Sequence, residues 1–258
     1  MTGRLANVAL ASMAGALCVF LVLPTLIVAP ISFTETDFIT FPPQGFSGRW
    51  YAAFFEQPEW WGSLLTSVVV AAGTTVAATV LGTMVALGLP RLPPRASRLV
   101  SFFFLLPMIV PTIITAVALY TPLAKTGLIA TRPGLVLAHT ILALPFVVIN
   151  VSAVVQKLDW RIVDAARSLG ASPVVAFRRA TLPALAPGIA AGAVFAFLTS
   201  FDEVVVALFI SGGSATTLPV QMWSGIRFEI SPIVAAASCL LLVVSCLFLS
   251  LAWFLKRK

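Results

Sequence analysis

Long stretches without a charged residue restrict how this chain can fold more than any other feature. Such runs cover residues 5–34, 62–89, 99–123, 133–156 and 230–255, and a sixth, 184–210, is interrupted only by Asp202 and Glu203. Each exceeds the roughly 20 apolar residues that a helix needs to cross a bilayer. Only 10% of the 258 residues are charged, against about 25% in soluble domains. The sequence therefore predicts an all-α, polytopic membrane protein with six transmembrane helices.

The first run is longer than the apolar core of a signal peptide, which spans about 7–15 residues, and no convincing small-residue cleavage site follows it. We therefore expect a retained transmembrane helix there. Pro107 and Pro111 should kink the third span, because each removes a backbone hydrogen bond. Residues 35–61 are expected to form an extracytoplasmic loop with a short amphipathic segment around 50–55, and residues 211–229 a second external loop.

The distribution of charge predicts the orientation. With the N-terminus inside, six spans place twelve of the 16 basic residues in the cytoplasm: Arg4, Arg91, Arg95, Arg98, Lys157, Arg161, Arg167, Arg178, Arg179, Lys256, Arg257 and Lys258. Only Asp159 and Asp164 oppose them, and the other seven of the nine acidic residues lie at or beyond the outer margin. Basic residues favour cytoplasmic loops, so both termini are expected to be cytoplasmic.

One polar island, residues 159–189, separates the fourth and fifth spans. Asp159 can cap a short helix beginning near Trp160, and Gly170 stands where a helix end needs a left-handed residue. Ser172 and Pro173 read as the N-cap and first position of a second helix, which Pro183 and Pro187 should stop or kink. The pattern predicts a helix, a sharp turn and a second helix on the cytoplasmic face.

This island also carries a resemblance to a known family. The sequence Asp164-Ala165-Ala166, then Gly170, then Thr181-Leu182-Pro183 and finally Pro187-Gly188 closely resembles the "EAA loop" of ABC importer permeases. That family usually has Glu where this chain has Asp164. In the family the loop forms a coupling helix that sits in a cleft of a cytoplasmic ATPase subunit. The resemblance therefore implies ATPase-coupling roles for Asp164, Ala165, Ala166, Gly170, Leu182 and Pro183; the alternative is an ordinary amphipathic loop.

The resemblance extends over nearly the whole chain. FSGRWYAAFF at 46–55, SFDEVVVALFISGG at 200–213 and TTLPVQMWSGIRFEISP at 216–232 are similar to the spermidine/putrescine subgroup of these permeases. It implies the type I ABC importer permease fold: one transmembrane domain over 1–258, with a core over 62–255 and a cytoplasmic coupling loop over 157–183. It also implies a bacterial inner (cytoplasmic) membrane location, a second and different permease chain, two cytoplasmic ATP-binding subunits and an external solute-binding protein.

Asp202 and Glu203 are the candidate residues for the solute path. A charge at membrane depth costs about 2.5–3.5 kcal/mol on insertion scales and usually faces a protein interior or a wet cavity. Such carboxylates would attract a cationic amine and repel an anion, which favours a polyamine or a similar small cationic solute. For these residues the alternatives are structural pairing, for example with Arg227 or a partner chain, or an interfacial position just outside the bilayer. For the function, the alternatives are a permease for another small solute, such as an amino-acid-like molecule, or an ion-coupled secondary transporter.

Several other functions lack their sequence signals. No Gly-rich loop with Lys-Ser or Lys-Thr is present to hold a nucleotide phosphate. His139 has no nucleophile at motif spacing and is expected to hydrogen-bond between helices, while the three cysteines lack metal-ligand spacing. The basic residues form no nucleic-acid-binding face among aromatic residues. We therefore expect a lipid-embedded transport subunit, neither an enzyme nor a nucleic-acid binder, with ATP and magnesium held by the partner ATPase.

Overall fold

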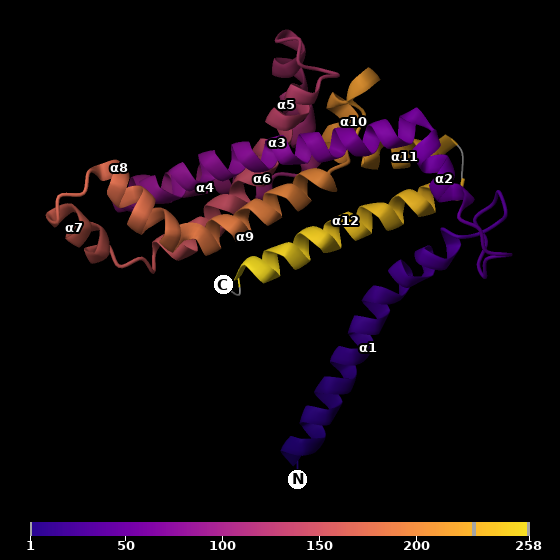
Figure 1. Ribbon diagram of the computed structural model, residues 1–258, viewed down its shortest axis with the longest axis horizontal. Helices are drawn as coiled ribbons and strands as arrows, with labels where there is room; N and C mark the ends of the chain where they lie inside the picture. Colours follow the sequence, from indigo (N-terminus) through magenta and orange to yellow (C-terminus); the bar gives the residue numbers. More distant parts are fainter. Residues whose placement is uncertain (1, 229–230, 257–258) are drawn as a thin grey trace. The chain divides into compact units, whose positions relative to one another are not determined.

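The computed structural model describes residues 2–228 and 231–256 (Figure 1), and the described residues form helices, turns and loops without a strand. The α-helices are α1 (Thr2–Ile31), α2 (Arg49–Glu56), α3 (Pro58–Gly88), α4 (Pro94–Ile109), α5 (Thr112–Lys125), α6 (Arg132–Val155), α7 (Arg161–Ser168), α8 (Pro173–Ala176), α9 (Leu182–Phe201), α10 (Val205–Ile210), α11 (Leu218–Phe228) and α12 (Ile233–Lys256). The all-α prediction is confirmed. Within the described ranges, five helices are long and apolar enough to span a membrane, or six if the bent pair α4–α5 counts as one span.

The chain divides into two compact units. The first contains residues 1–61 and 222–244, and in it the expected short helix is present as α2. The Tyr51 hydroxyl hydrogen-bonds the Ser32 hydroxyl at 2.8 Å, and the Trp50 indole nitrogen donates to the Thr34 carbonyl at 2.9 Å. Phe54 is fully buried, with its ring centroid 6.0 Å from that of Trp60. These contacts tie α2 to the end of α1.

The second unit contains residues 62–221 and 245–258, and α6 is its central helix. α6 packs most extensively against α9 and also contacts α4, α5 and α10. Gly188 and Gly192 of α9 permit this close packing, because a Cβ at either position would lie about 3 Å from the α6 backbone. Small residues let membrane helices approach closely. The buried side chains of Val147 and Val151 fill the core of this contact.

The third predicted span is two helices that meet at an angle of 105°. The break falls at Val110, which is extended with ψ of 131°, and at Pro111. A proline disfavours helical backbone in the residue before it, and Pro111 also lacks the amide hydrogen that would continue the helix. The sequence located this break correctly but predicted only a kink.

The fifth span also differs from the prediction. α9 ends at Phe201, and α10 is a separate short helix, so residues 184–210 are not one helix. At the other end, α8, a π-helical turn (Phe177–Thr181) and α9 form one continuous helical stretch, Pro173–Phe201. Pro183 lies in the first turn of α9, where a missing amide hydrogen is tolerated, and Pro187 lies inside α9. Neither proline therefore ends the helix, which was one of the two effects expected of them.

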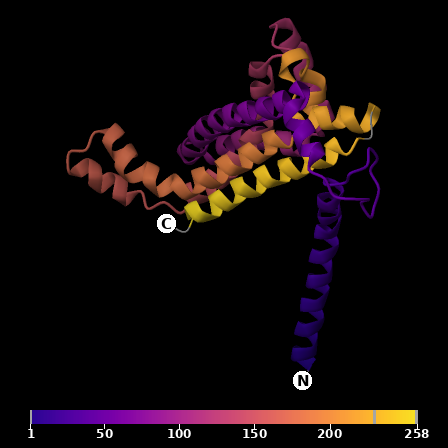
Figure 2. The ribbon, with the colours of Figure 1, turned by 45° about the vertical axis from the view of Figure 1, so that its right-hand side comes forward.

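The second external loop was also predicted without its helix. Residues 218–228 form α11, and the Ser67 hydroxyl of α3 accepts a hydrogen bond of 2.7 Å from the Leu218 amide at its start. Figures 1 and 2 both show α7 and α8 near one end of α9 and α10 beyond its other end. The second unit thus has a polar loop at one end of α9 and a helix break at the other.

Candidate functional site

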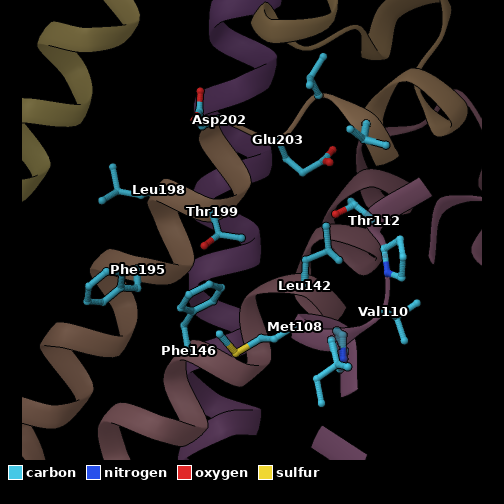
Figure 3. A pocket seen from close by; sticks show the side chains of 15 residues that line it. Met108, Val110, Thr112, Leu142, Phe146, Phe195, Leu198, Thr199, Asp202 and Glu203 are labelled. Carbon is cyan, nitrogen blue, oxygen red and sulfur yellow. The ribbon is translucent and has the colours of Figure 1, made fainter. Parts of the chain in front are cut away.

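A cavity of about 820 Å³ lies where the α4–α5 break and the α9–α10 break come together (Figure 3). Its lining residues are Pro107, Met108, Ile109, Val110, Pro111, Thr112, Leu142, Phe146, Phe195, Leu198, Thr199, Asp202, Glu203, Val204 and Val205. Broken helices release backbone groups and recur at the binding sites of membrane transporters. Asp202 and Glu203, the two path residues predicted from the sequence, both line this cavity.

Asp202 directly follows the last residue of α9. Its backbone amide donates to the Leu198 carbonyl at 3.1 Å, which completes the helix, and its side chain is exposed. The carboxylate is therefore accessible to a solute that enters the cavity.

Glu203, the next residue, is only 8% exposed. Its two carboxylate oxygens accept hydrogen bonds from the amides of Val206 and Ala207, each at 2.9 Å. These amides belong to the first turn of α10, where backbone donors have no partner within the helix. Glu203 therefore caps α10, which favours structural pairing for this carboxylate.

Behind Glu203 lies His139, which is fully buried. Its Nδ1 shares a hydrogen bond of 2.9 Å with the Ser200 hydroxyl, and its Nε2 lies 3.7 Å from Glu203 Oε2. Ser200 escaped the sequence analysis because it is 61 residues from His139. Ser200 is only 3% exposed, so this Ser–His–Glu arrangement has no room for a substrate at its hydroxyl. His139 connects α6 to the end of α9, as the interhelical role predicted.

Apolar and aromatic side chains make up most of the remaining cavity wall. The rings of Phe146 and Phe195 are almost parallel, at 12°, with centroids 6.0 Å apart. Figure 3 shows them on adjacent helices beside Met108, with the Thr199 hydroxyl above them. None of the described residues that line the cavity is basic. The cavity thus combines an accessible carboxylate, π-faces and hydroxyls with an apolar surface.

The loop between α6 and α9 has the local geometry expected from the sequence. Asp159 Oδ1 accepts from the Arg161 amide at 3.1 Å, and Gly170 has a left-handed φ of 88°. Ser172 Oγ accepts from the Val175 amide at 3.4 Å, so α8 begins as predicted. The helix–turn–helix pattern is present because each of its signals acts within a few residues.

The predicted coupling residues fall on two elements. Asp164, Ala165 and Ala166 lie in α7, and Gly170 follows it, whereas Leu182 and Pro183 begin α9. Asp164 and Ala165 are exposed, and so are the apolar side chains of Ile162 (57%), Leu169 (89%) and Val174 (65%). Sequence reasoning had not singled out these three apolar residues, which give the loop an exposed apolar surface.

Comparison with known proteins shows the family. Residues 78–258 match the family described as "Binding-protein-dependent transport system inner membrane component". The chain is 30% identical over 239 residues to the spermidine/putrescine transport system permease protein PotC of Haemophilus influenzae, covering 93% of each protein. It is 33% identical over 246 residues to the putrescine transport system permease protein PotI of Escherichia coli K12, covering 93% of this chain and 87% of PotI.

Solved structures show the same fold at lower identity. A bacterial ABC transporter involved in import of the acidic polysaccharide alginate aligns with a TM-score of 0.73 at 14% identity, covering 100% of this chain and 97% of that chain. The MetNI methionine ABC transporter aligns with a TM-score of 0.62 at 18% identity, covering 76% and 93%. These comparisons confirm a multi-pass transport subunit rather than an enzyme. This chain belongs to the family of binding-protein-dependent transport system inner membrane components, as a permease subunit of an ABC importer.

Proposed function

We propose that this permease subunit carries a polyamine or a similar small cationic amine through the cavity between the two helix breaks. The observation that carries the proposal is the lining itself, which presents the accessible Asp202 carboxylate and includes no basic residue among its described members. The names of its relatives, which specify spermidine and putrescine, support the same solute class.

Each part of a flexible alkylamine has a complementary group in the cavity. An ammonium a few ångströms from Asp202 would gain about 1–4 kcal/mol, depending on the effective dielectric. The faces of Phe146 and Phe195 can add about 0.5–2 kcal/mol through cation–π attraction. The alkyl chain can pack on Met108 and Leu142. These contributions are modest, which suits a path that must release its solute.

An amino-acid-like solute fits the same lining less well. Its carboxylate would lie near Asp202 and Glu203 without a basic side chain from the lining to neutralise it. An unpaired charge in a poorly hydrated site is strongly disfavoured. We therefore prefer a cation without a carboxylate.

We further propose that the loop over 157–183 docks onto a cytoplasmic ATPase subunit that holds ATP and magnesium. The exposed apolar side chains of Ile162, Leu169 and Val174 support this role, with Asp164 as a polar contact and Ala165 allowing close approach. The full transporter would contain this chain, a second and different permease, two ATP-binding subunits and an external solute-binding protein. Both termini of this chain would be cytoplasmic.

The test of the solute path is Asp202→Asn, which keeps the shape and removes the charge. Uptake of radiolabelled putrescine into proteoliposomes should fall about tenfold, equivalent to about 1.4 kcal/mol, while complex assembly and basal ATP hydrolysis persist. Glu56→Gln is the matched control, because Glu56 is an exposed carboxylate in α2, outside the cavity. Wild-type uptake by the Asp202 variant, or a failure of assembly alone, would refute the path role.

A further inference from the structure

A second pocket, of about 330 Å³, lies between α4 and α5 and is closed on one side by α6. Phe103 and Ile114 lie at its open side, 66% and 56% exposed, and Ile141 and Leu144 of α6 form its back. Its side chains are all hydrocarbon except for the Thr115 hydroxyl. The volume lies at the lower end of the range for small-molecule sites, about 300–1,000 Å³.

The pocket and the solute cavity open on different faces of α6. Leu142 and Phe146 line the cavity, whereas Ile141 and Leu144 line the pocket. Successive helix residues point about 100° apart, so the mean directions of the two pairs differ by about 150°. A pocket that opens away from the solute path, between the two apolar helices of a bent span, is the kind of surface that a membrane protein presents to lipid.

The start of α4 supplies the charge that a phospholipid needs. Arg95 and Arg98 are exposed and lie in its first two turns. Arg95 is eleven residues before Leu106, which lines the pocket. This separation is about 16 Å along a helix and about three turns, so both residues lie on one side of α4. Basic residues beside a span attract anionic lipids. A phosphate held at this level leaves an acyl chain running along α4 into the pocket.

We propose that this pocket binds one acyl chain of an anionic membrane phospholipid whose phosphate pairs with Arg95 and Arg98. The bound acyl chain fills the space between α4 and α5 beside their break. Pro107 and Val110 line both the pocket and the solute cavity. The lipid therefore supports the cavity wall from behind. The binding is independent of the solute, but its effect on transport rests on the function proposed above.

The test measures lipid retention on the intact transporter complex. The complex is released from phosphatidylethanolamine nanodiscs, with or without phosphatidylglycerol, and retained lipid is counted by native mass spectrometry. The Arg95→Gln/Arg98→Gln double variant and the pocket-filling Ala118→Phe should each lose one phosphatidylglycerol per copy of this chain. Lys157→Gln removes a basic residue elsewhere, and Val117→Phe adds a ring on an exposed part of α5 that does not line the pocket. Both controls should retain the lipid.

Uptake supplies the second measurement. In vesicles with phosphatidylglycerol, both test variants should transport several-fold more slowly than the wild type and match its rate in phosphatidylethanolamine alone. Asp202→Asn should lose uptake but keep the lipid. Failure of the solute proposal can therefore be distinguished from failure of the lipid proposal. Undiminished lipid in the arginine variant overturns the inference even if Ala118→Phe does not fold. A wild-type complex that retains no lipid, while the isolated full-length chain does, also overturns it, because the partner permease then covers the pocket.

Discussion

Asp202 and Glu203 are chemically similar and adjacent, yet they lie in different environments. Asp202 is exposed at the end of α9, whereas Glu203 is buried and accepts hydrogen bonds from the Val206 and Ala207 amides. A carboxylate whose oxygens are both engaged by the backbone has little capacity left for a solute. We therefore assign attraction of the cation to Asp202 and stabilisation of the α9–α10 break to Glu203.

Glu203→Gln should reduce stability without directly removing the solute contact. The amide oxygen can still accept one hydrogen bond, but the amide nitrogen cannot accept the other, so one buried backbone donor loses its partner. Such a loss costs about 1–3 kcal/mol. Thermal unfolding of the purified protein in detergent should show a lower midpoint for this variant than for Asp202→Asn. Equal midpoints for the two variants would contradict the capping role.

Ser200→Ala should also destabilise the protein, because it leaves His139 Nδ1 buried without its partner, at a cost of about 1–3 kcal/mol. The double variant His139→Phe/Ser200→Ala removes both polar groups. We expect its loss of stability to be smaller, by about 0.5–3 kcal/mol, than the sum of the losses in the single variants His139→Phe and Ser200→Ala, as is typical of residues in contact. Thermal unfolding of all four proteins measures this coupling. Additive losses would show that the hydrogen bond between α6 and α9 has no energetic weight.

At the scale of elements, the sequence predicted what local interactions determine. Asp159, Gly170 and Ser172 each act on backbone groups within three residues, so the loop before α9 could be foreseen in detail. The break after Phe201 could not, because residues 184–210 are apolar on both sides of it and the buried Glu203 packs beside His139, which is 64 residues earlier in the chain. α11 was missed for a similar reason, since its first amide is held by Ser67 of another helix.

The turn after α7 gives a test of the coupling loop. Gly170 has a φ of 88°, and a Cβ there would meet no atom within 4 Å, so any effect of substitution comes from the backbone rather than from a clash. Gly170→Val should cost about 1–2 kcal/mol in the left-handed region and displace α7. Solute-stimulated ATP hydrolysis in the reconstituted complex should then fall severalfold.

Gly170→Asn is the matched control, because asparagine tolerates the left-handed conformation at helix ends. It should preserve most of the coupling. If the valine variant couples ATP hydrolysis to transport as well as the asparagine variant does, the turn has no part in coupling.

At the scale of the whole molecule, the charge distribution predicts which side of the membrane each loop faces. Single cysteines at Arg95 and Arg178 should react with an impermeant thiol reagent only in inverted vesicles, and a cysteine at Gln44 only in intact cells. The background must lack Cys18, Cys239 and Cys246. Lys258, a further cytoplasmic site by charge, lies outside the described residues. Labelling of position 178 from outside would overturn both the six-span orientation and the docking of the loop on an ATPase.

The stretch Pro173–Phe201 has a mechanical consequence. At about 1.5 Å per residue, its 29 residues give about 44 Å of helix between the loop and the residue before Asp202. A tilt of about 10° of the α9 part, which has 20 residues and is about 30 Å long, would displace its far end by about 5 Å, nearly the pitch of one helical turn. The π-helical turn at Phe177–Thr181 lies near the loop end. If the helix pivots at this turn, the longer part, α9, is the part that extends toward the cavity. A small rotation imposed at the loop would thereby move the residue before Asp202 by several ångströms.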